Sequence, residues 1–278
     1  MAFDSTGKVS FDDIYTAPDP RAFFGTLRGL DYQIPQLAQP YFATLIESYR
    51  ADQRVAEPVV LDVGCSYGVN GALHRRATTM AEMFEYYDGA AELERAALLA
   101  HDSGLPPATG GRTRFIGLDT SAPALAYARA AGFVDETIHA DFESTDPDEG
   151  QQAVLDGVDI VISTGCVGYV TEKTLVRISR GARPWMAHFV LRMFSYEPMA
   201  DSLAELGYET TSIHGVFKQR RFASSAEQAQ ILDTLSAAGV DPRGLETDGW
   251  LYAQLYVSRP RGAGTGLAAA LHDLRARG

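Results

Sequence analysis

Five short apolar runs recur along the chain with helical patterns between them, and this alternation constrains the fold more than any other feature. The runs are VVLDV at 59–63, RFIGLD at 114–119, ETIHAD at 136–141, VDIVIST at 158–164 and AHFVLRM at 187–193. Nearly continuous apolar strands are typical of a sheet that is covered on both faces. Because strands that alternate with helices pair in parallel, the sequence predicts a doubly wound α/β fold.

Two more strands are expected near the end, at 211–222 and 250–260, which gives a mostly parallel seven-stranded sheet. The segment between them, SSAEQAQILDTLSAAG, predicts a helix with Ser224 or Ser225 as its N-cap and Gly239 at its end. The main domain is therefore expected over 58–260. Residues 261–278 are interpreted as a C-terminal tail, a flexible joint followed by a short helix.

Prolines interrupt the first 57 residues, at positions 18, 20, 35 and 40. Because proline removes a backbone donor and restricts the residue before it, short helices and turns are favoured over a strand. Pro40 is expected to open a helix through YFATLIESYR. The segment is also rich in aromatic residues that need burial, so we expect 1–57 to be a helical cap on the main domain.

Composition narrows the class of protein. The 278 residues are 46% hydrophobic with a net charge of −12, which suits a globular chain and argues against binding nucleic acid. No apolar run reaches the roughly 18 residues of a membrane span, and the first residues show no secretory leader. Two cysteines exclude a disulfide framework and a four-thiolate zinc site. We expect a cytoplasmic protein, monomer or homodimer, with a small-molecule partner and no metal.

A glycine-containing loop, DVGCSYGVNG at 62–71, follows the first expected strand. Glycines at such a place let the backbone turn tightly and approach a ligand, while the next helix presents its amide end. The same residues spell the G-x-S-x-G nucleophile elbow of hydrolases, with Ser66 as nucleophile. No HGGG-like oxyanion segment precedes the loop, which counts against a hydrolase. Later histidines leave that alternative open.

Acidic residues end the next two strands. Asp119 precedes the helical segment SAPALAYARAAG, and a carboxylate there can accept both hydroxyls of a ribose. Asp141 ends the third run and can accept an exocyclic amine, while the ring of Phe142 can lie against a purine. Together with the glycine loop, these residues indicate a nucleoside-containing ligand.

At this point the chain resembles the class I S-adenosylmethionine (SAM)-dependent methyltransferases. The resemblance rests on LDVGCSYG, on G-x-D-x-S-x-x-x-L-x-x-A-R at 117–129, on HADFES and on VDIVISTGCVGYV, and it covers about 58–260. The CSYG loop, together with DYQIPQLAQPYF, is similar to a poorly characterised bacterial branch. Two features depart from the family: Ser66 stands where glycine is commoner, and a helical insertion at about 78–112 separates the first two acids. That insertion is either a surface addition or a lid.

The resemblance implies SAM as cofactor and a role for each matching position. Asp62, Gly64 and the backbone of Cys65 and Ser66 would hold the methionine part. Asp119 would bind the ribose with Thr120 beside it, and Asp141 and Phe142 would hold the adenine. Thr164 and Gly165, which end the fourth strand, would face the sulfonium and the second substrate.

Other candidates each carry two interpretations. Tyr32 and Gln33 reach over the SAM carboxylate or belong to the packed cap. Tyr169 lines the acceptor pocket or packs inward. Arg192 holds an acidic substrate or forms an ion pair, and His214 is a base or a structural residue.

The expected reaction is methyl transfer to a small molecule, which chiefly requires in-line alignment and exclusion of water. A first alternative keeps SAM and changes the reaction: its own amine attacks the carbon γ to the carboxylate, giving azetidine-2-carboxylate and methylthioadenosine. A second alternative is a non-catalytic SAM-binding module. Cys65 and Cys166 follow neighbouring strands of such a sheet, and two free thiols are favoured over a disulfide.

Overall fold

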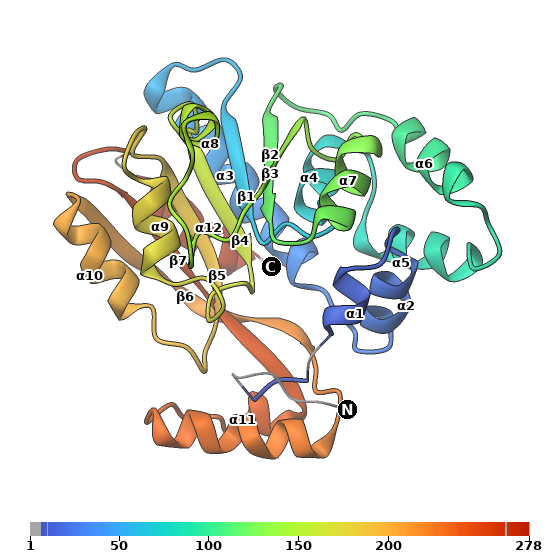
Figure 1. Ribbon diagram of the computed structural model, residues 1–278. Helices are drawn as coiled ribbons and strands as arrows, with labels where there is room; N and C mark the ends of the chain where they lie inside the picture. The colour runs from blue at the N-terminus through green and yellow to red at the C-terminus, as the bar shows by residue number, and fades with distance from the viewer. Residues whose placement is uncertain (1–6, 10, 265, 278) are drawn as a thin grey trace.

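The computed structural model describes residues 7–9, 11–264 and 266–277. Its seven strands form one sheet in the order β3-β2-β1-β4-β5-β7-β6 (Figure 1). The strands are β1 (Val59–Val63), β2 (Arg114–Asp119), β3 (Glu136–His139), β4 (Ile160–Thr164), β5 (Trp185–Leu191), β6 (Tyr208–Arg221) and β7 (Trp250–Pro260). β7 runs antiparallel to both of its neighbours, β5 and β6, and the other described strand pairs are parallel. The predicted α/β fold with a mostly parallel seven-stranded sheet is confirmed.

Helices cover both faces of this sheet. They are α1 (Asp12–Tyr15), α2 (Arg21–Arg28), α3 (Ile34–Gln53), α4 (Val69–Arg75), α5 (Met80–Gly89), α6 (Arg95–Gly104), α7 (Ala122–Ala130), α8 (Glu149–Leu155), α9 (Glu172–Ile178), α10 (Glu197–Glu205), α11 (Ser225–Ala237) and α12 (Leu267–Arg277). One core lies between the sheet and α3 with α12, and a second lies between the sheet and α8, α9 and α10. No helix of the described part of the chain is long and apolar enough to cross a membrane.

Burial on both faces explains the apolar strands. Every residue of β5 is buried, and four of the five residues of β1 are buried. The structure moves some predicted limits: β4 begins at Ile160, and β5 ends at Leu191. Arg192 therefore follows its strand instead of lying within it, which changes the direction available to its side chain.

The prediction that Pro40 opens a helix is wrong. The helix α3 begins at Ile34 with Pro35 in its first turn, and Pro40 lies inside it. Pro35 is tolerated because the first turn needs no donor from it. The helix continues past Pro40 because buried side chains such as Phe42 and Leu45 anchor it in the core.

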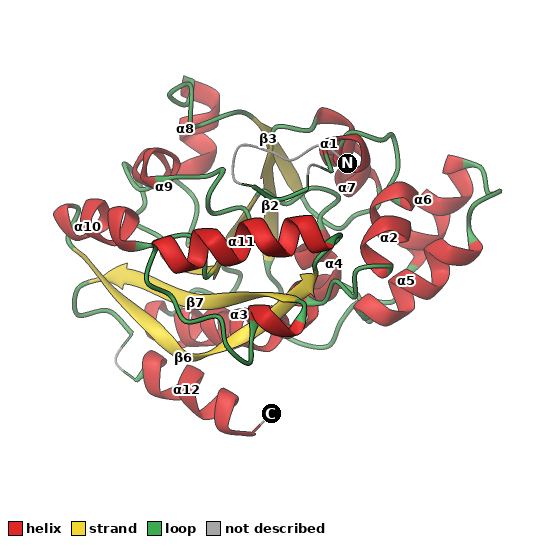
Figure 2. Cartoon of the chain, turned by 90° about the horizontal axis from the view of Figure 1, so that it is seen from below, coloured by secondary structure: helices red, strands yellow, loops and turns green. Residues whose placement is uncertain are grey.

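Two predictions for the last part of the chain, the helix after Ser224 and the C-terminal tail, can be compared with the structure. The N-cap at Ser224 is confirmed, since its side chain accepts a hydrogen bond from the amide of Glu227. The tail is more ordered than expected: α12 packs against α3 and β6, with Leu267 and Leu271 buried in the core. Figure 2, which views the molecule from below, shows α12 beside β6 and α11 crossing the side that faces the viewer.

Candidate functional site

A cavity of about 620 Å³ lies at the carboxyl ends of β1, β2 and β4, where the strand order reverses. Its volume is within the usual range for small-molecule sites, and open α/β sheets bind ligands at such reversals. Eleven residues expected from the sequence line it: Tyr32, Gly64, Cys65, Ser66, Asp119, Thr120, Asp141, Phe142, Thr164, Gly165 and Tyr169. The topology thus gathers residues that are far apart along the chain.

The loop after β1 is a left-handed turn. Gly64 and Gly68 have φ of +68° and +76°, and Ser66 adopts +48° although it is not glycine. A Cβ atom at position 64 would lie 2.6 Å from Cβ of Cys166, so only glycine fits there. The amide of Ser66 donates to Oδ2 of Asp119 at 2.8 Å, and this hydrogen bond holds the serine in its uncommon conformation.

Three buried side-chain oxygen atoms lie in this loop and in the strand and the helix on either side of it. Oδ1 of Asp62 accepts a hydrogen bond from Nδ2 of Asn70 at 3.0 Å, and the same Nδ2 donates to Oγ1 of Thr164 at 3.1 Å. Oδ2 of Asp62, Oδ1 of Asn70 and Oγ of Ser66 have no hydrogen-bond partner in the described part of the chain. Burial raises the pKa of Asp62 to about 7. Ser66 and Asn70 belong to the described lining, whereas Asp62 lies behind it and is linked to it through Asn70. Buried acceptors without donors are costly, so this end of the cavity favours a cationic group with several N–H donors.

Asp119 and Asp141 differ in their surroundings. Each carboxylate oxygen of Asp119 accepts one backbone amide, from Ser66 and from Ser121, both at 2.8 Å. Each oxygen keeps a second lone pair for a ligand hydroxyl. Asp141 is exposed, and a hydrogen bond from the hydroxyl of Ser144 lowers its pKa. Phe142 is buried in the core and contributes to the cavity wall.

Tyr32 closes the cavity from the cap side. Its ring meets Phe23 edge-on at 6.2 Å, and its hydroxyl is hydrogen-bonded to Thr164. Burial raises the pKa of Tyr32 far above its ordinary value, so the phenol stays neutral. Gln33 lies outside the lining; it precedes α3, and its amide donates to the carbonyl oxygen of Gln219 at 2.9 Å.

Two predicted catalytic residues lie elsewhere. Arg192 forms an ion pair with Glu246 at 2.6 Å and donates to the carbonyl of Asp241, which is the structural interpretation of that arginine. His214 is exposed at an irregularity of β6, where its ring lies 5.1 Å from that of His272. Neither belongs to the described lining of the cavity, so the structure does not bring them together with the other predicted site residues.

The hydrolase alternative has no base to support it. The Oγ atom of Ser66 has no hydrogen-bond partner within the described residues, and no histidine is found in the described lining of the cavity. Cys65 and Cys166 are both free thiols. Sγ of Cys166 lies 3.2 Å from the carbonyl oxygen of Val63, and burial raises the pKa of this thiol to about 12.

An N-terminal strap, defined as residues 7–9 and 11–20, lies along the cavity and was not expected from the sequence. Lys8, Val9, Phe11, Tyr15 and Thr16 contribute to the lining. Only the density of aromatic residues hinted at this role. The strap makes the cavity narrower and more aromatic than the sheet edge alone would.

The strap is held at several points by hydrogen bonds. The amide of Val9 donates to Oε1 of Glu227 at 2.9 Å. The hydroxyl of Ser121 donates to the carbonyl of Tyr15 at 2.7 Å. The hydroxyl of Tyr67 donates to the carbonyls of Ile14 and Ala17, at 2.9 and 2.8 Å.

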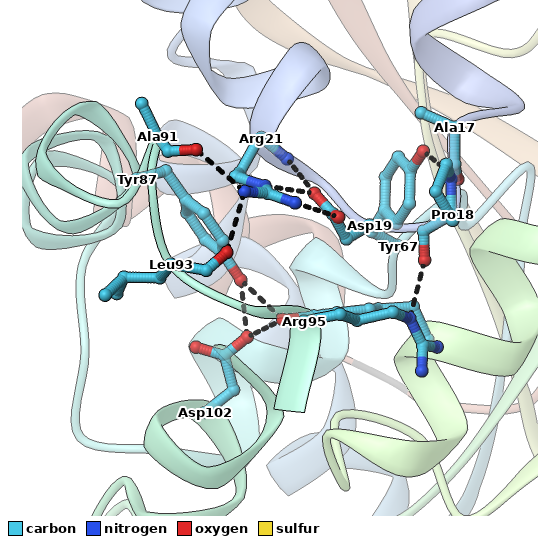
Figure 3. Close-up of polar contacts among 11 residues, drawn as sticks. Ala17, Pro18, Asp19, Arg21, Tyr67, Tyr87, Ala91, Leu93, Arg95 and Asp102 are labelled. Atoms are coloured by element: carbon cyan, nitrogen blue, oxygen red, sulfur yellow. Dashed lines mark hydrogen bonds and ion pairs between the residues drawn. The ribbon is translucent and has the colours of Figure 1, made fainter. Parts of the chain in front are cut away.

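The insertion supports the cap from behind instead of covering the cavity. Arg21 pairs with Asp19 at 2.8 Å and donates to the carbonyls of Ala91 and Leu93, as Figure 3 shows. In the same view, buried Asp102 accepts a hydrogen bond from Tyr87. Asp102 also accepts a hydrogen bond from the hydroxyl of Tyr127. No residue of 78–112 belongs to the described lining. In this structure the insertion lies beside the cap and outside the described lining.

No family model and no curated protein matches the chain. Solved structures with a similar fold include a TehB-like SAM-dependent methyltransferase from Corynebacterium glutamicum (14% identity, 76% of this chain and 85% of that chain, TM-score 0.37). Others are the YcgJ protein from Bacillus subtilis (14%, 79% and 99%, 0.41) and geranyl diphosphate C-methyltransferase from Streptomyces coelicolor with S-adenosyl-L-homocysteine (12%, 79% and 79%, 0.36). Similarities at these values do not identify the activity of this chain.

Proposed function

We propose that this chain binds SAM at the carboxyl-end cavity and transfers its methyl group to a small-molecule acceptor. The observation that carries the proposal is the set of three buried, unpartnered atoms on Asp62, Ser66 and Asn70, of which Ser66 and Asn70 line the cavity and Asp62 lies directly behind Asn70. The ammonium of an amino acid has three N–H donors and a positive charge, as a lysine ammonium does. It would supply the missing hydrogen bonds and favour the ionised form of Asp62.

The rest of the cavity fits the remaining parts of SAM. Asp119 would accept the ribose hydroxyls with its free lone pairs, and Phe142 would pack against the adenine near Asp141. SAM supplies an electrophilic methyl group on a sulfonium. Aromatic faces favour such a cation, and the ring of Tyr32 lies beside Thr164 at the end of β4.

The chain itself positions the reactants and surrounds them with apolar side chains. Asn70 ties Asp62 to Thr164 and so fixes the loop against β4. Phe11, Tyr15 and Phe23 contribute aromatic rings to the cavity wall. Holding two reactants in line can supply about 7–11 kcal/mol of the barrier reduction, so no covalent intermediate with the protein is needed.

Binding comes first in testing the proposal. Calorimetry should show that SAM and S-adenosylhomocysteine bind more tightly than methylthioadenosine, which has the nucleoside but no ammonium. Equal affinity for all three would show that the buried atoms do not hold an amino group. Asp146→Asn, which changes an exposed acid outside the cavity lining, should bind all three ligands as the parent chain does.

Turnover then distinguishes the reactions. Purified protein is incubated with SAM alone and with pools of small molecules, and the nucleosides are analysed by mass spectrometry. Methyl transfer predicts S-adenosylhomocysteine only when an acceptor is present. Methylthioadenosine formed from SAM alone would overturn methyl transfer in favour of self-alkylation, and binding without any turnover would indicate a non-catalytic module.

A further inference from the structure

Part of the cavity lining has no role in the proposed recognition of SAM, and its chemistry restricts the acceptor. This inference rests on the proposed function. This part of the lining includes the rings of Phe11, Tyr15 and Phe23. Gln219 of β6 supplies its principal neutral polar group.

Gln219 is held firmly but its carboxamide is uncommitted. Its backbone carbonyl accepts the amide of Gln33, which fixes β6 against the start of α3. The residue is 7% exposed and lines the cavity, and its side chain has no hydrogen bond to any described residue. The carboxamide therefore borders the cavity with its donors and its acceptor available to a ligand.

The position of this carboxamide is set by Gly165. A Cβ atom at residue 165 would lie 2.3 Å from Nε2 of Gln219, so the side chain can occupy its place only because position 165 is glycine. Gly165 directly follows Thr164 at the end of β4. The carboxamide therefore reaches the place where the proposed function puts the methyl group.

Of the two cations in the described lining, Arg220 already has a carboxylate partner. Arg220 donates to both carboxylate oxygens of Glu227, at 2.8 and 3.0 Å, and this pair is buried. The ammonium of Lys8 lies over the ring of Tyr169, 4.3 Å from its centroid. A charged acceptor entering between the aromatic rings would lose its hydration without gaining the guanidinium of Arg220 as a counter-ion.

We propose that Gln219 orients the acceptor, and that the acceptor is a neutral, planar compound with a hydrogen-bond donor next to an acceptor, such as a lactam or a hydroxylated heteroaromatic ring. A carboxamide presents one donor and one acceptor side by side, so it pairs with such an edge through two hydrogen bonds. The aromatic walls bind the ring faces.

The test uses 2-pyridone as the probe, with benzoate and benzylamine as anionic and cationic rings of similar size. Each is titrated by ligand-observed NMR into protein saturated with S-adenosylhomocysteine. 2-Pyridone is expected to bind most tightly. Gln219→Leu should weaken it on the order of tenfold, because two neutral hydrogen bonds are lost. The affinity for S-adenosylhomocysteine should stay unchanged.

The controls separate this inference from the proposed function. Gln228→Leu removes a glutamine that lies outside the cavity lining and should leave 2-pyridone binding as in the parent chain. Gln219→Glu preserves the size of the side chain and should also weaken 2-pyridone, which covers the case in which Gln219→Leu fails to fold. Absent or Gln219-independent binding of 2-pyridone, or tighter binding of benzoate or benzylamine, would overturn the inference. Failure of S-adenosylhomocysteine to bind would instead remove the proposed function.

Discussion

At the scale of single residues, the acids at the strand ends were predictable and their partners were not. Asp62, Asp119 and Asp141 follow apolar runs, and the ends of parallel strands meet at one edge, so their positions follow from the pattern. Asn70 looks like an ordinary helical residue until the turn at Gly68 brings its carboxamide onto Asp62. Such short-range geometry leaves no mark in hydrophobic periodicity.

The raised pKa of Asp62 makes binding of SAM depend on pH. With a pKa of about 7, Asp62 is largely protonated in the free chain at pH 6. The ammonium of SAM favours the carboxylate and lowers that pKa, so binding below pH 7 releases a proton. Affinity should therefore fall as pH decreases from 7 to about 5, by at most roughly tenfold per unit.

Calorimetry across this pH range in buffers of different ionisation enthalpy would count the released proton. Asp62→Asn removes the titrating group and should give a weaker but flat profile, whereas Asp146→Asn should retain the slope. A parent chain with equal affinity at pH 5.5 and 7.5 would contradict the role given to Asp62.

Removal of the Asp119 carboxylate should weaken the binding of SAM about tenfold or more. Its oxygens are expected to accept the ribose hydroxyls, and a hydrogen bond to a charged group is worth about 1.5–3 kcal/mol. Asp119→Asn preserves the shape, so it should lose less than Asp119→Ala, because one oxygen can still accept the amide of Ser66. Titrations of both variants with S-adenosylhomocysteine would measure this; parental affinity in both would refute the assignment.

At the scale of elements, the strands and most helices follow from the sequence, while the strap and the limits of α3 do not. Pro40 suggested a helix start because proline is favoured there, but tertiary burial of Phe42 and Leu45 decides where α3 lies. The strap has no periodic pattern. Its path is set by hydrogen bonds to side chains such as Tyr67 and Glu227, which come from distant parts of the chain.

Loosening the strap should speed the release of SAM. Tyr67→Phe removes the hydroxyl that donates to the carbonyls of Ile14 and Ala17 without changing the ring. The single hydroxyl proton is shared between the two carbonyls, so one neutral hydrogen bond worth about 0.5–1.5 kcal/mol is lost and the dissociation rate should rise roughly twofold to tenfold. Stopped-flow displacement of SAM would measure that rate.

Tyr49→Phe is the matched control for this measurement. It removes a tyrosine hydroxyl that donates to Asp159 at 2.7 Å, outside the cavity lining. Its SAM dissociation rate should equal that of the parent chain. Equal rates in all three proteins would mean that the strap does not retain the ligand.

At the scale of the whole molecule, the ligand should stabilise the fold, because the cavity joins the sheet, the cap and β6. A ligand at a hundred times its Kd adds about 2.7 kcal/mol to the free energy of unfolding. For a chain of this size the melting temperature should rise by roughly 5–10 °C. Calorimetric melts with SAM would show this, with adenine as control; an unchanged melting temperature would contradict binding at the cavity.

The contacts that complete the cavity join residues made early to residues made late, so the order of synthesis determines when the cavity can form. Arg221 pairs with Asp31 across 190 positions, and Glu227 accepts the amide of Val9 across 218 positions. At about 5–20 residues per second, the ribosome needs roughly 10–40 s to make the second partner after the first. During that interval the aromatic rings of the cap have no β6 to pack against. The ligand site is thus among the last parts of the nascent protein to form. Until β6 has been made, the exposed cap stays soluble only if its aggregation is slow or if chaperones bind it.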